Sequence, residues 1–444
     1  MGGSINNQPG RGGKRRLSPL ATYLLVPALV VTLGACDRLL EVDLPGAVTS
    51  ASLNDPRLAE TLVLGAEGDF ECGFVDIMTY GGEWYELFLN TSASRPDALA
   101  GLRSQLIDVY ADPCDSGTGP IWTIMQVPRI QAKRAIELIN GFDPAPSNKN
   151  ELLARSYLIQ AYSIQLLTEQ HCNVTFDAGP LLTREQGFAL AKESFTSAIG
   201  LAAGLPDVLA AAYIGRARSN LYLGDDAGVL ADASNPAVTE GFEWVATYDL
   251  SPGRRNNRIA EDNILGDSYM PHERYTNNTI SADGRLTVGD GVPDPRVVVR
   301  TLEKNEPRGL IPYREQRKYP SEDTPITVAS WREAQLMMAE VQGGQAAVDL
   351  INLLRSNNAG LPQEIDGSAW PLPQFASTDA AEIAQLVLDE RLRELWMHAV
   401  EGGDKLRNGY PAWEDFDEYN QPLNEGRCLP VPFLEIASNP NLGI

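Results

Sequence analysis

The chain has 444 residues, of which 43% are hydrophobic and 21% are charged, and its formal net charge at pH 7 is −23. This is the composition of a globular protein, so a collagen-like chain and a wholly disordered chain are excluded. The acidic balance also argues against a nucleic-acid partner, because phosphate binding needs clustered Lys and Arg side chains.

The N-terminus has the pattern of an export signal. The basic segment Lys14–Arg16 precedes an apolar stretch, Leu20–Leu33, which is followed by Gly34-Ala35-Cys36. This predicts a signal peptide over residues 1–35, because the apolar stretch is too short to span a bilayer comfortably. The cysteine at the cleavage point makes the segment look like a bacterial lipobox and predicts lipidation of Cys36. A plain signal peptide with a chance cysteine is the alternative.

No later stretch is apolar for long enough to form a transmembrane helix. The expected membrane connection is therefore the acyl chains on Cys36, each buried methylene of which contributes about 0.8 kcal/mol. We expect residues 36–444 to form a single domain. Asp37, directly after the lipidated cysteine, leaves open which membrane leaflet holds the anchor.

Four further cysteines remain, and an even number in an exported protein suggests two disulfides. Three pairings are possible. The compact one is Cys72–Cys114 with Cys172–Cys428; free buried thiols are the alternative. No Cys-x-x-Cys is present and there are only three His residues, so we expect neither a metal site nor a cofactor.

Helical patterns begin near Asp55, where Asp55-Pro56 suits a helix start, and continue over residues 121–139 and 151–170. Thr183 and Gln186 form a capping box for the next helix, which ends before Gly204. Asp207 is expected to cap the helix that follows, and Gly224 to end it.

These helices form antiparallel pairs that repeat about every 38 residues, a spacing that resembles the tetratricopeptide unit. A further pair is predicted over residues 331–341 and 345–355, around a Gly343-Gly344 turn, and Asp379 caps a helix from Ala380 to about Val400. The predicted fold is mainly α: a tetratricopeptide-like helical scaffold over 55–233 and 329–400. An irregular α-bundle is the alternative.

Residues 234–328 lack helical periodicity and are rich in Asn, Gly, Pro, Asp and Tyr. A loop-rich excursion this long is usually functional or disordered. We expect it to bind the ligand, with a few short strands such as residues 297–300 inside it.

Several motifs together resemble one family. Glu390–Trp396 resembles the "ER-x-x-EL" helix of the SusD/RagB nutrient-uptake lipoproteins, and Asp404 with Arg407 resembles their "DL-x-R" stretch. The remaining matches are Lys318-Tyr319 with Pro325-Ile326, the ending Cys428–Glu435 with Asn439–Leu442, and Leu40-Glu41-Val42 with Pro45 after the lipobox. One departure is the segment His398–Glu401, where the family usually has "EG-x-R".

The resemblance implies a surface-exposed, lipid-anchored protein of the cell outer membrane. Such proteins sit on a TonB-dependent transporter of the SusC type, bind oligosaccharides or sometimes peptides, and deliver them to that transporter. The membrane would be touched through the lipid anchor only.

Sugar rings are held by aromatic faces, and their hydroxyls by amide or acid groups. Aromatic residues that stand among polar residues are therefore the candidates for ligand binding, although each is also compatible with an ordinary packed ring. The candidates are Trp84, Tyr85, Asn90, Tyr269, Tyr275, Asn277 and Tyr313.

No sequence motif of a catalytic site is present, and a protein with 59 acidic residues will contain close carboxylates by chance. We therefore expect a binding protein without catalysis. The alternatives are an envelope scaffold or peptide-binding lipoprotein and, less favoured, an exported hydrolase.

Overall fold

A computed structural model describes residues 54–92, 121–250, 256–361, 367–415, 418–419 and 428–442. The chain divides into a unit of residues 1–53 and a unit of residues 54–444, and only the second is considered below. The signal segment 1–35 and Cys36 lie outside the described residues, so the expectations about them stay predictions.

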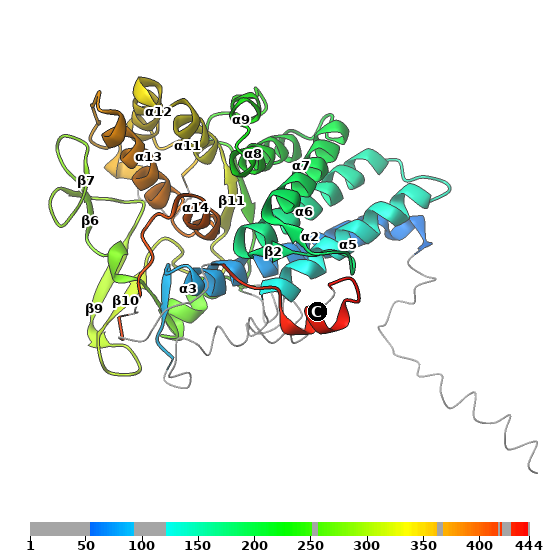
Figure 1. Cartoon of the computed structure of the whole chain (residues 1–444), viewed down its shortest axis with the longest axis horizontal. Coiled ribbons are helices and arrows are strands. Elements are labelled where there is room, and N and C mark those ends of the chain that lie inside the picture. Colours follow the sequence, from blue (N-terminus) through cyan, green and yellow to red (C-terminus); the bar gives the residue numbers. More distant parts are fainter. Residues whose placement is uncertain are drawn as a thin grey trace, which may run out of the picture. The chain divides into compact units, whose positions relative to one another are not determined.

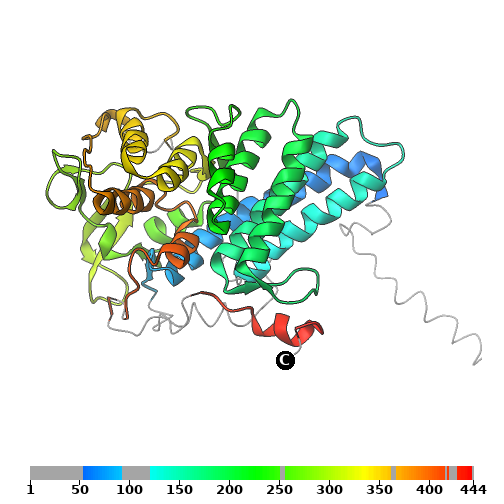
Figure 2. The same ribbon diagram turned by 45° about the horizontal axis from the view of Figure 1, so that its top comes forward.

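The first half of this unit is a stack of long helices (Figures 1 and 2). Helix α5 packs on α6, α6 on α7 and α7 on α8, while α2 lies against both α5 and α6. Their bounds are α2 Ala59–Asp76, α5 Ile121–Gly141, α6 Lys149–Gln170, α7 Arg184–Leu201 and α8 Pro206–Leu223. The prediction of a mainly α, helical-repeat scaffold is confirmed.

Local signals set these helix ends. The Asp55 side chain accepts a hydrogen bond from the Arg57 N–H. In the predicted capping box, the Thr183 side chain accepts from the Gln186 N–H and the Gln186 side chain accepts from the Thr183 N–H. Gly224 ends α8 with φ +70°, a conformation that favours glycine. The cap predicted at Asp207 is wrong: α8 begins at Pro206, because proline suits the first helical position.

The second group of helices includes the predicted pair around Gly343-Gly344. Both glycines have positive φ. Helix α11 packs against α8, α9, α12 and α13. The bounds are α9 Asp226–Ala233, α11 Trp331–Gln342, α12 Gly344–Ser356, α13 Ala380–Glu394, α14 Glu401–Asn408 and α15 Phe433–Ser438.

Helix α13 starts at the predicted Asp379 cap but ends at Glu394, so the extension to Val400 is wrong. The chain turns there through two positive-φ residues, Met397 and Ala399. The turn buries His398, whose Nε2 lies 3.0 Å from the Lys318 ammonium. A second helix, α14, then begins at Glu401.

Eleven short strands form small antiparallel sheets in the described residues, in the orders β1-β5, β2-β3, β4-β11, β9-β10 and β7-β6-β8. Their bounds are β1 Phe88–Asn90, β2 Asn173–Val174, β3 Leu182–Thr183, β4 Glu243–Ala246, β5 Tyr269–Pro271, β6 Asn278–Ile280, β7 Leu286–Val288, β8 Val292–Pro293, β9 Val299–Asn305, β10 Pro312–Gln316 and β11 Ile326–Ser330. Short helical turns are η3 Pro56–Leu58, η4 Ile77–Gly81, α3 Gly82–Trp84, α10 Arg258–Ala260, η5 Glu261–Leu265, η6 Glu273–Tyr275 and η7 Gly367–Ala369.

The segment 234–328 is therefore more ordered than predicted. It contains β4 to β10 and the start of β11, and Met270 and Tyr313 are completely buried. Strand β5 pairs with β1, far away in sequence, with Leu89 opposite Met270. Most of these strands have only two to five residues, which is too short for an alternating pattern to stand out, and this is why the sequence suggested loops.

The C-terminal segment is fastened to the end of α6. Cys172 and Cys428 form the predicted disulfide. Backbone hydrogen bonds from the Leu429 N–H to the Gln170 carbonyl (3.0 Å) and from the Cys172 N–H to the Leu429 carbonyl (2.8 Å) flank it. Cys72 is buried in α2, but Cys114 lies outside the described residues, so their pairing stays a prediction.

Within the described residues, we find no helix whose length and hydrophobicity would let it cross a membrane. These residues also contain no group of three or more His, Cys, Asp or Glu side chains that could hold a metal ion.

Candidate functional site

A groove of about 490 Å³ lies where α13 meets strands β6 and β7 and the chain that follows α14. Figure 1 shows α13 beside these strands. We call this cavity the Tyr410 groove. Its lining residues are Arg274, Asn278, Leu286, Thr287, Val288, Asp389, Leu392, Arg393, Tyr410, Pro411, Ala412, Trp413 and Glu414.

Two aromatic side chains come from the turn after α14. Gly409 ends that helix with φ +65°, and its N–H donates to the Lys405 carbonyl at 2.8 Å. The chain then leaves the helix and presents Tyr410 and Trp413, both half-buried, to the groove. A large aromatic surface in a concave site is typical of small-molecule binding sites.

Two side chains, Tyr85 and Lys405, pack against the Trp413 ring. The Tyr85 ring lies 5.8 Å from it, and the Lys405 ammonium lies 4.2 Å from its centroid, within the range of a cation–π contact. Lys405 in turn donates to the Glu86 carboxylate at 2.5 Å. Burial lowers the pKa of Lys405 to about 8, against the opposing effect of Glu86.

A carboxylate stands beside the second ring. Asp389 accepts hydrogen bonds from the Tyr410 hydroxyl and from the Gln385 amide (3.2 Å), both through Oδ1. Burial raises the pKa of Asp389, and these hydrogen bonds oppose that effect. No hydrogen bond to Oδ2 is found from a described residue, and a carboxylate oxygen of this kind can accept further hydrogen bonds.

Arg393 joins α13 to the strands at the groove wall. It donates to the carbonyl oxygens of Thr279 (2.9 Å) and Thr287 (3.0 Å) and lies 3.3 Å from Asp294. These contacts use its guanidinium to hold the wall in place.

The lining residues Arg274 and Glu414 are held in place by Glu86, which is buried and has φ +64°. Its carboxylate accepts from Arg274 (2.9 Å) and from the Glu414 N–H (3.1 Å), besides Lys405. Arg274 also donates to the Glu414 carboxylate at 2.6 Å. The residues around Trp413 are thus fixed by a charged network before any ligand arrives.

His272 takes part in this network in its neutral form. Its Nδ1 accepts from the Arg274 N–H (3.3 Å) and Nε (3.2 Å), and its Nε2 lies 3.2 Å from Glu414. Burial and the nearby cations Arg274, Arg314 and Lys405 lower the pKa of His272 to about 3.

A second, much smaller cavity of about 20 Å³ lies under the groove and shares Leu392, Tyr410 and Pro411 with it. Tyr85 and Tyr275 line it. It has room for about one water molecule, so it is too small for a sugar ring.

The structure changes the role of the aromatic residues selected from the sequence. All of the aromatic candidates, and Asn90, are at most 6% exposed. Tyr313 donates from its hydroxyl to the Tyr269 carbonyl at 2.7 Å, and Tyr275 packs on Trp396 with ring centroids 5.6 Å apart. The prediction that they line an open ligand site is therefore corrected: Trp84, Tyr85, Tyr269, Tyr275 and Tyr313 are packed rings of the interior.

Two of these residues still bear on the groove, since Tyr85 supports Trp413 and Tyr275 lines the small cavity below. Asn277 is exposed with φ +53° in the turn before Asn278, which lines the groove. Asn90 instead uses its carbonyl oxygen to accept from the Ser92 N–H at 3.0 Å.

Sequence reasoning missed Tyr410, Trp413 and Asp389. One local signal was present: Gly409-Tyr410-Pro411 with Trp413 places two aromatic residues in a turn directly after a helix. Asp389 could not be found in this way, because it lies on a helix among many other acidic residues.

Comparison with solved structures identifies the architecture. A SusD-like protein from Bacteroides fragilis superposes with a TM-score of 0.60 at 13% identity, over 90% of this chain and 99% of its own. A SusD-like carbohydrate-binding protein from the same organism gives 0.61 at 14% identity, over 88% and 99%. The chain has a SusD-like fold. A laminarin-binding SusD-like protein shares this fold with a TM-score of 0.53 at 14% identity, over 87% and 98% of the two chains. From sequence alone, no family model matches and no curated relative is detected.

In this SusD-like chain the motif residues hold the fold together. Glu390 and Glu394 of α13 are buried and accept from Arg296, and the Arg332 Nε donates to Glu394 at 2.5 Å. Arg391 is paired with Asp404 at 2.8 Å, and Arg407 is paired with Glu340. These charged motif residues are therefore structural and are not among the residues that line the Tyr410 groove, although Leu392 and Arg393 of the same helix segment do line it.

Proposed function

We propose that the protein is a non-catalytic nutrient-binding lipoprotein, which captures an oligosaccharide in the Tyr410 groove and passes it to a TonB-dependent transporter of the SusC type. The observation that carries the proposal is the pairing of Tyr410 and Trp413 with a half-buried carboxylate, Asp389, in one preformed cavity. Aromatic faces suit the C–H faces of pyranose rings, and the carboxylate suits their hydroxyls.

The comparisons support a sugar as the ligand. One of the solved structures with this fold is described as carbohydrate-binding and another as laminarin-binding. At 14% identity they share the fold with this chain, so the particular glycan has to be found by experiment.

The charged groups around the groove support binding without bond cleavage. Asp389 is hydrogen-bonded to Tyr410 and Gln385, and Glu414 is bonded to Arg274. Each carboxylate thus has a partner that holds it in place. General acid–base hydrolysis would instead need two carboxyl groups that flank the scissile bond and are free to exchange protons with the substrate or water.

The lipobox sequence supports the proposed location. Lipidation of Cys36 would tether the chain to the outer membrane and bring it close to the transporter. Expression of the full chain with labelled palmitate tests this part: we expect label in the wild type and none in Cys36→Ser. Equal labelling of both would contradict it.

Calorimetric titration against a panel of oligosaccharides tests the ligand, followed by analysis of each mixture for cleavage products. We expect micromolar binding, about −8 kcal/mol at 1 μM, of at least one glycan, with no products. Asp389→Asn should weaken binding about tenfold, whereas the exposed control Asp283→Asn should not change it. Cleavage of a glycan, or binding of peptides alone, would contradict the proposal.

A further inference from the structure

A second groove of about 310 Å³ lies on the helical stack and shares no lining residue with the Tyr410 groove. It is bounded by α2, α6, the start of α8 and strand β4. We call it the Trp244 groove. Its lining residues are Leu64, Glu67, Gly68, Phe70, Glu71, Arg155, Leu158, Ile159, Val208 and Trp244.

The floor of this groove is apolar and rigid. Leu158 and Ile159 of α6 are buried, and Trp244 is half-buried. The Trp244 ring stacks on Phe70 at 5.7 Å and lies 4.9 Å from Tyr162. Its backbone is fixed opposite Ala329 by the pairing of β4 with β11. An aromatic surface is therefore held in place at the side of an aliphatic floor.

The rim of the groove is acidic. Among the described residues that line it, the only cation is Arg155, which is bonded to Glu67 (2.6 and 2.7 Å) and Glu60 (2.7 Å) and lies 3.8 Å from Glu151. Glu71 is a fourth carboxylate, which accepts from the Thr247 N–H and hydroxyl at 3.1 and 3.0 Å. In the described part of the rim, one guanidinium thus stands against four carboxylates, in a chain whose net charge is already −23. Such a surface attracts cations and repels anions.

The groove is open at Gly68 in the middle of α2. A Cβ placed on Gly68 would meet no other atom within 4 Å, so the space beside this residue is unfilled. A larger side chain at this position would enter the groove without disturbing the packing of the helix.

We propose that the Trp244 groove docks a cationic segment of a partner polypeptide, through an arginine or lysine side chain with an apolar neighbour. The apolar part would cover Leu158 and Ile159, and the cation would lie at the Trp244 ring and close to Glu67 and Glu71. Charge complementarity selects this occupant. Anionic headgroups and nucleic acids are repelled by the rim, and a neutral glycan, although its hydroxyls could bond to the carboxylates, would leave the excess charge unbalanced.

Fluorescence anisotropy with the full chain tests this site. The probes are a labelled hexapeptide of alternating leucine and arginine, and the same peptide with glutamate in place of arginine. We expect the arginine peptide to bind at least tenfold more tightly than the glutamate peptide. Equal affinities, or no binding of the arginine peptide, would overturn the proposal.

Two variants localise the binding. Gly68→Trp should reduce the affinity for the arginine peptide at least tenfold, while Gly200→Trp, at an exposed position of α7 where a Cβ also meets nothing, should leave it unchanged. Equal affinity in both variants would mean that the peptide binds the acidic surface at large, and would overturn the proposal.

Glu71→Gln provides an independent check, because the amide oxygen can still accept from Thr247 while the charge is lost. We expect a several-fold loss of affinity, and an unchanged affinity would count against the site. Trp413→Ala should keep full peptide binding, which separates this proposal from the one made for the Tyr410 groove.

Discussion

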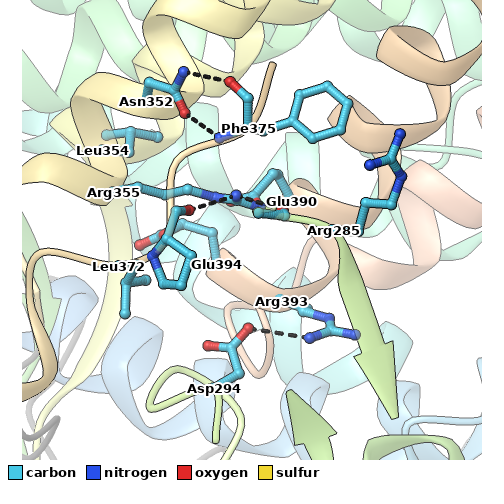
Figure 3. Close-up of polar contacts among 12 residues, drawn as sticks. Arg285, Asp294, Asn352, Leu354, Arg355, Leu372, Phe375, Glu390, Arg393 and Glu394 are labelled. Atoms are coloured by element: carbon cyan, nitrogen blue, oxygen red, sulfur yellow. Dashed lines mark hydrogen bonds and ion pairs between the residues drawn. The ribbon is translucent and has the colours of Figure 1, made fainter. Parts of the chain in front are cut away.

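Arg355 of α12 and Glu390 of α13 face each other in the interior, both completely buried, with the Arg355 Nε 3.1 Å from the Glu390 Oε1 (Figure 3). Arg355 also donates to the carbonyl oxygens of Gly284 (2.6 Å) and Pro373 (2.9 Å). Glu390 accepts a second time from Arg296, at 2.6 Å. This pair therefore ties two helices to the chain before β7, and so supports the wall of the Tyr410 groove.

Substitution Glu390→Gln should destabilise the fold strongly. It would leave the guanidinium groups of Arg296 and Arg355 buried without their shared carboxylate, and breaking a buried pair in this way costs about 3–5 kcal/mol. Denaturant unfolding measures the loss. The control is Glu382→Gln in the same helix, a partly exposed residue paired with Arg285, which should change little. Equal effects of the two substitutions would contradict the buried network's importance.

Glu169 should make the fold less stable as the pH rises. It is completely buried, and neither of its carboxylate oxygens accepts a hydrogen bond from a described residue. The Arg218 guanidinium lies 3.9 Å from Glu169, but Arg218 is itself bonded to Glu333. Burial raises the pKa of Glu169 from its ordinary 4.5 to about 8. Between these two values the folded chain keeps a proton that the unfolded chain releases, so stability falls with rising pH.

Glu169→Gln removes this effect, because glutamine stays neutral. The difference in Tm, variant minus wild type, should be larger at pH 8 than at pH 5. Thermal unfolding at the two pH values measures the difference, with Glu193→Gln on the exposed face of α7 as control. A Tm difference that does not change with pH would show that Glu169 is ionised in the folded chain.

Loss of the Cys172–Cys428 disulfide should lower the free energy of unfolding by about 2–5 kcal/mol, since the bond closes a loop of 256 residues in the unfolded chain. The double variant Cys172→Ser, Cys428→Ser can be compared with the oxidised wild type by denaturant unfolding. No change would mean that backbone contacts such as Leu429 to Gln170 alone hold the C-terminal segment.

The sequence predicted the helices well where local chemistry decides the structure. The capping box at Thr183, the stop at Gly224 and the cap at Asp379 are all present, because each depends on residues within one helical turn.

The Tyr410 groove could not be predicted in the same way. It brings together Arg274 and Asn278, Asp389 on α13 and Trp413 after α14, and no local pattern connects residues so far apart. Tyr269 and Tyr313 looked exposed because turn residues surround them, yet the pairing of short strands buries both. Burial here is set by tertiary contacts and not by neighbours in sequence.

The most direct test of the central claim is calorimetric titration of the wild type, Trp413→Ala and Phe433→Ala with the glycan that binds most tightly in the panel. Removal of Trp413 takes an aromatic surface out of the Tyr410 groove, whereas Phe433 is an exposed aromatic residue of α15 outside it. We predict a loss of affinity of at least tenfold for Trp413→Ala and an unchanged affinity for Phe433→Ala. Unchanged glycan affinity in a folded Trp413→Ala variant would contradict the assignment of this groove as the ligand site.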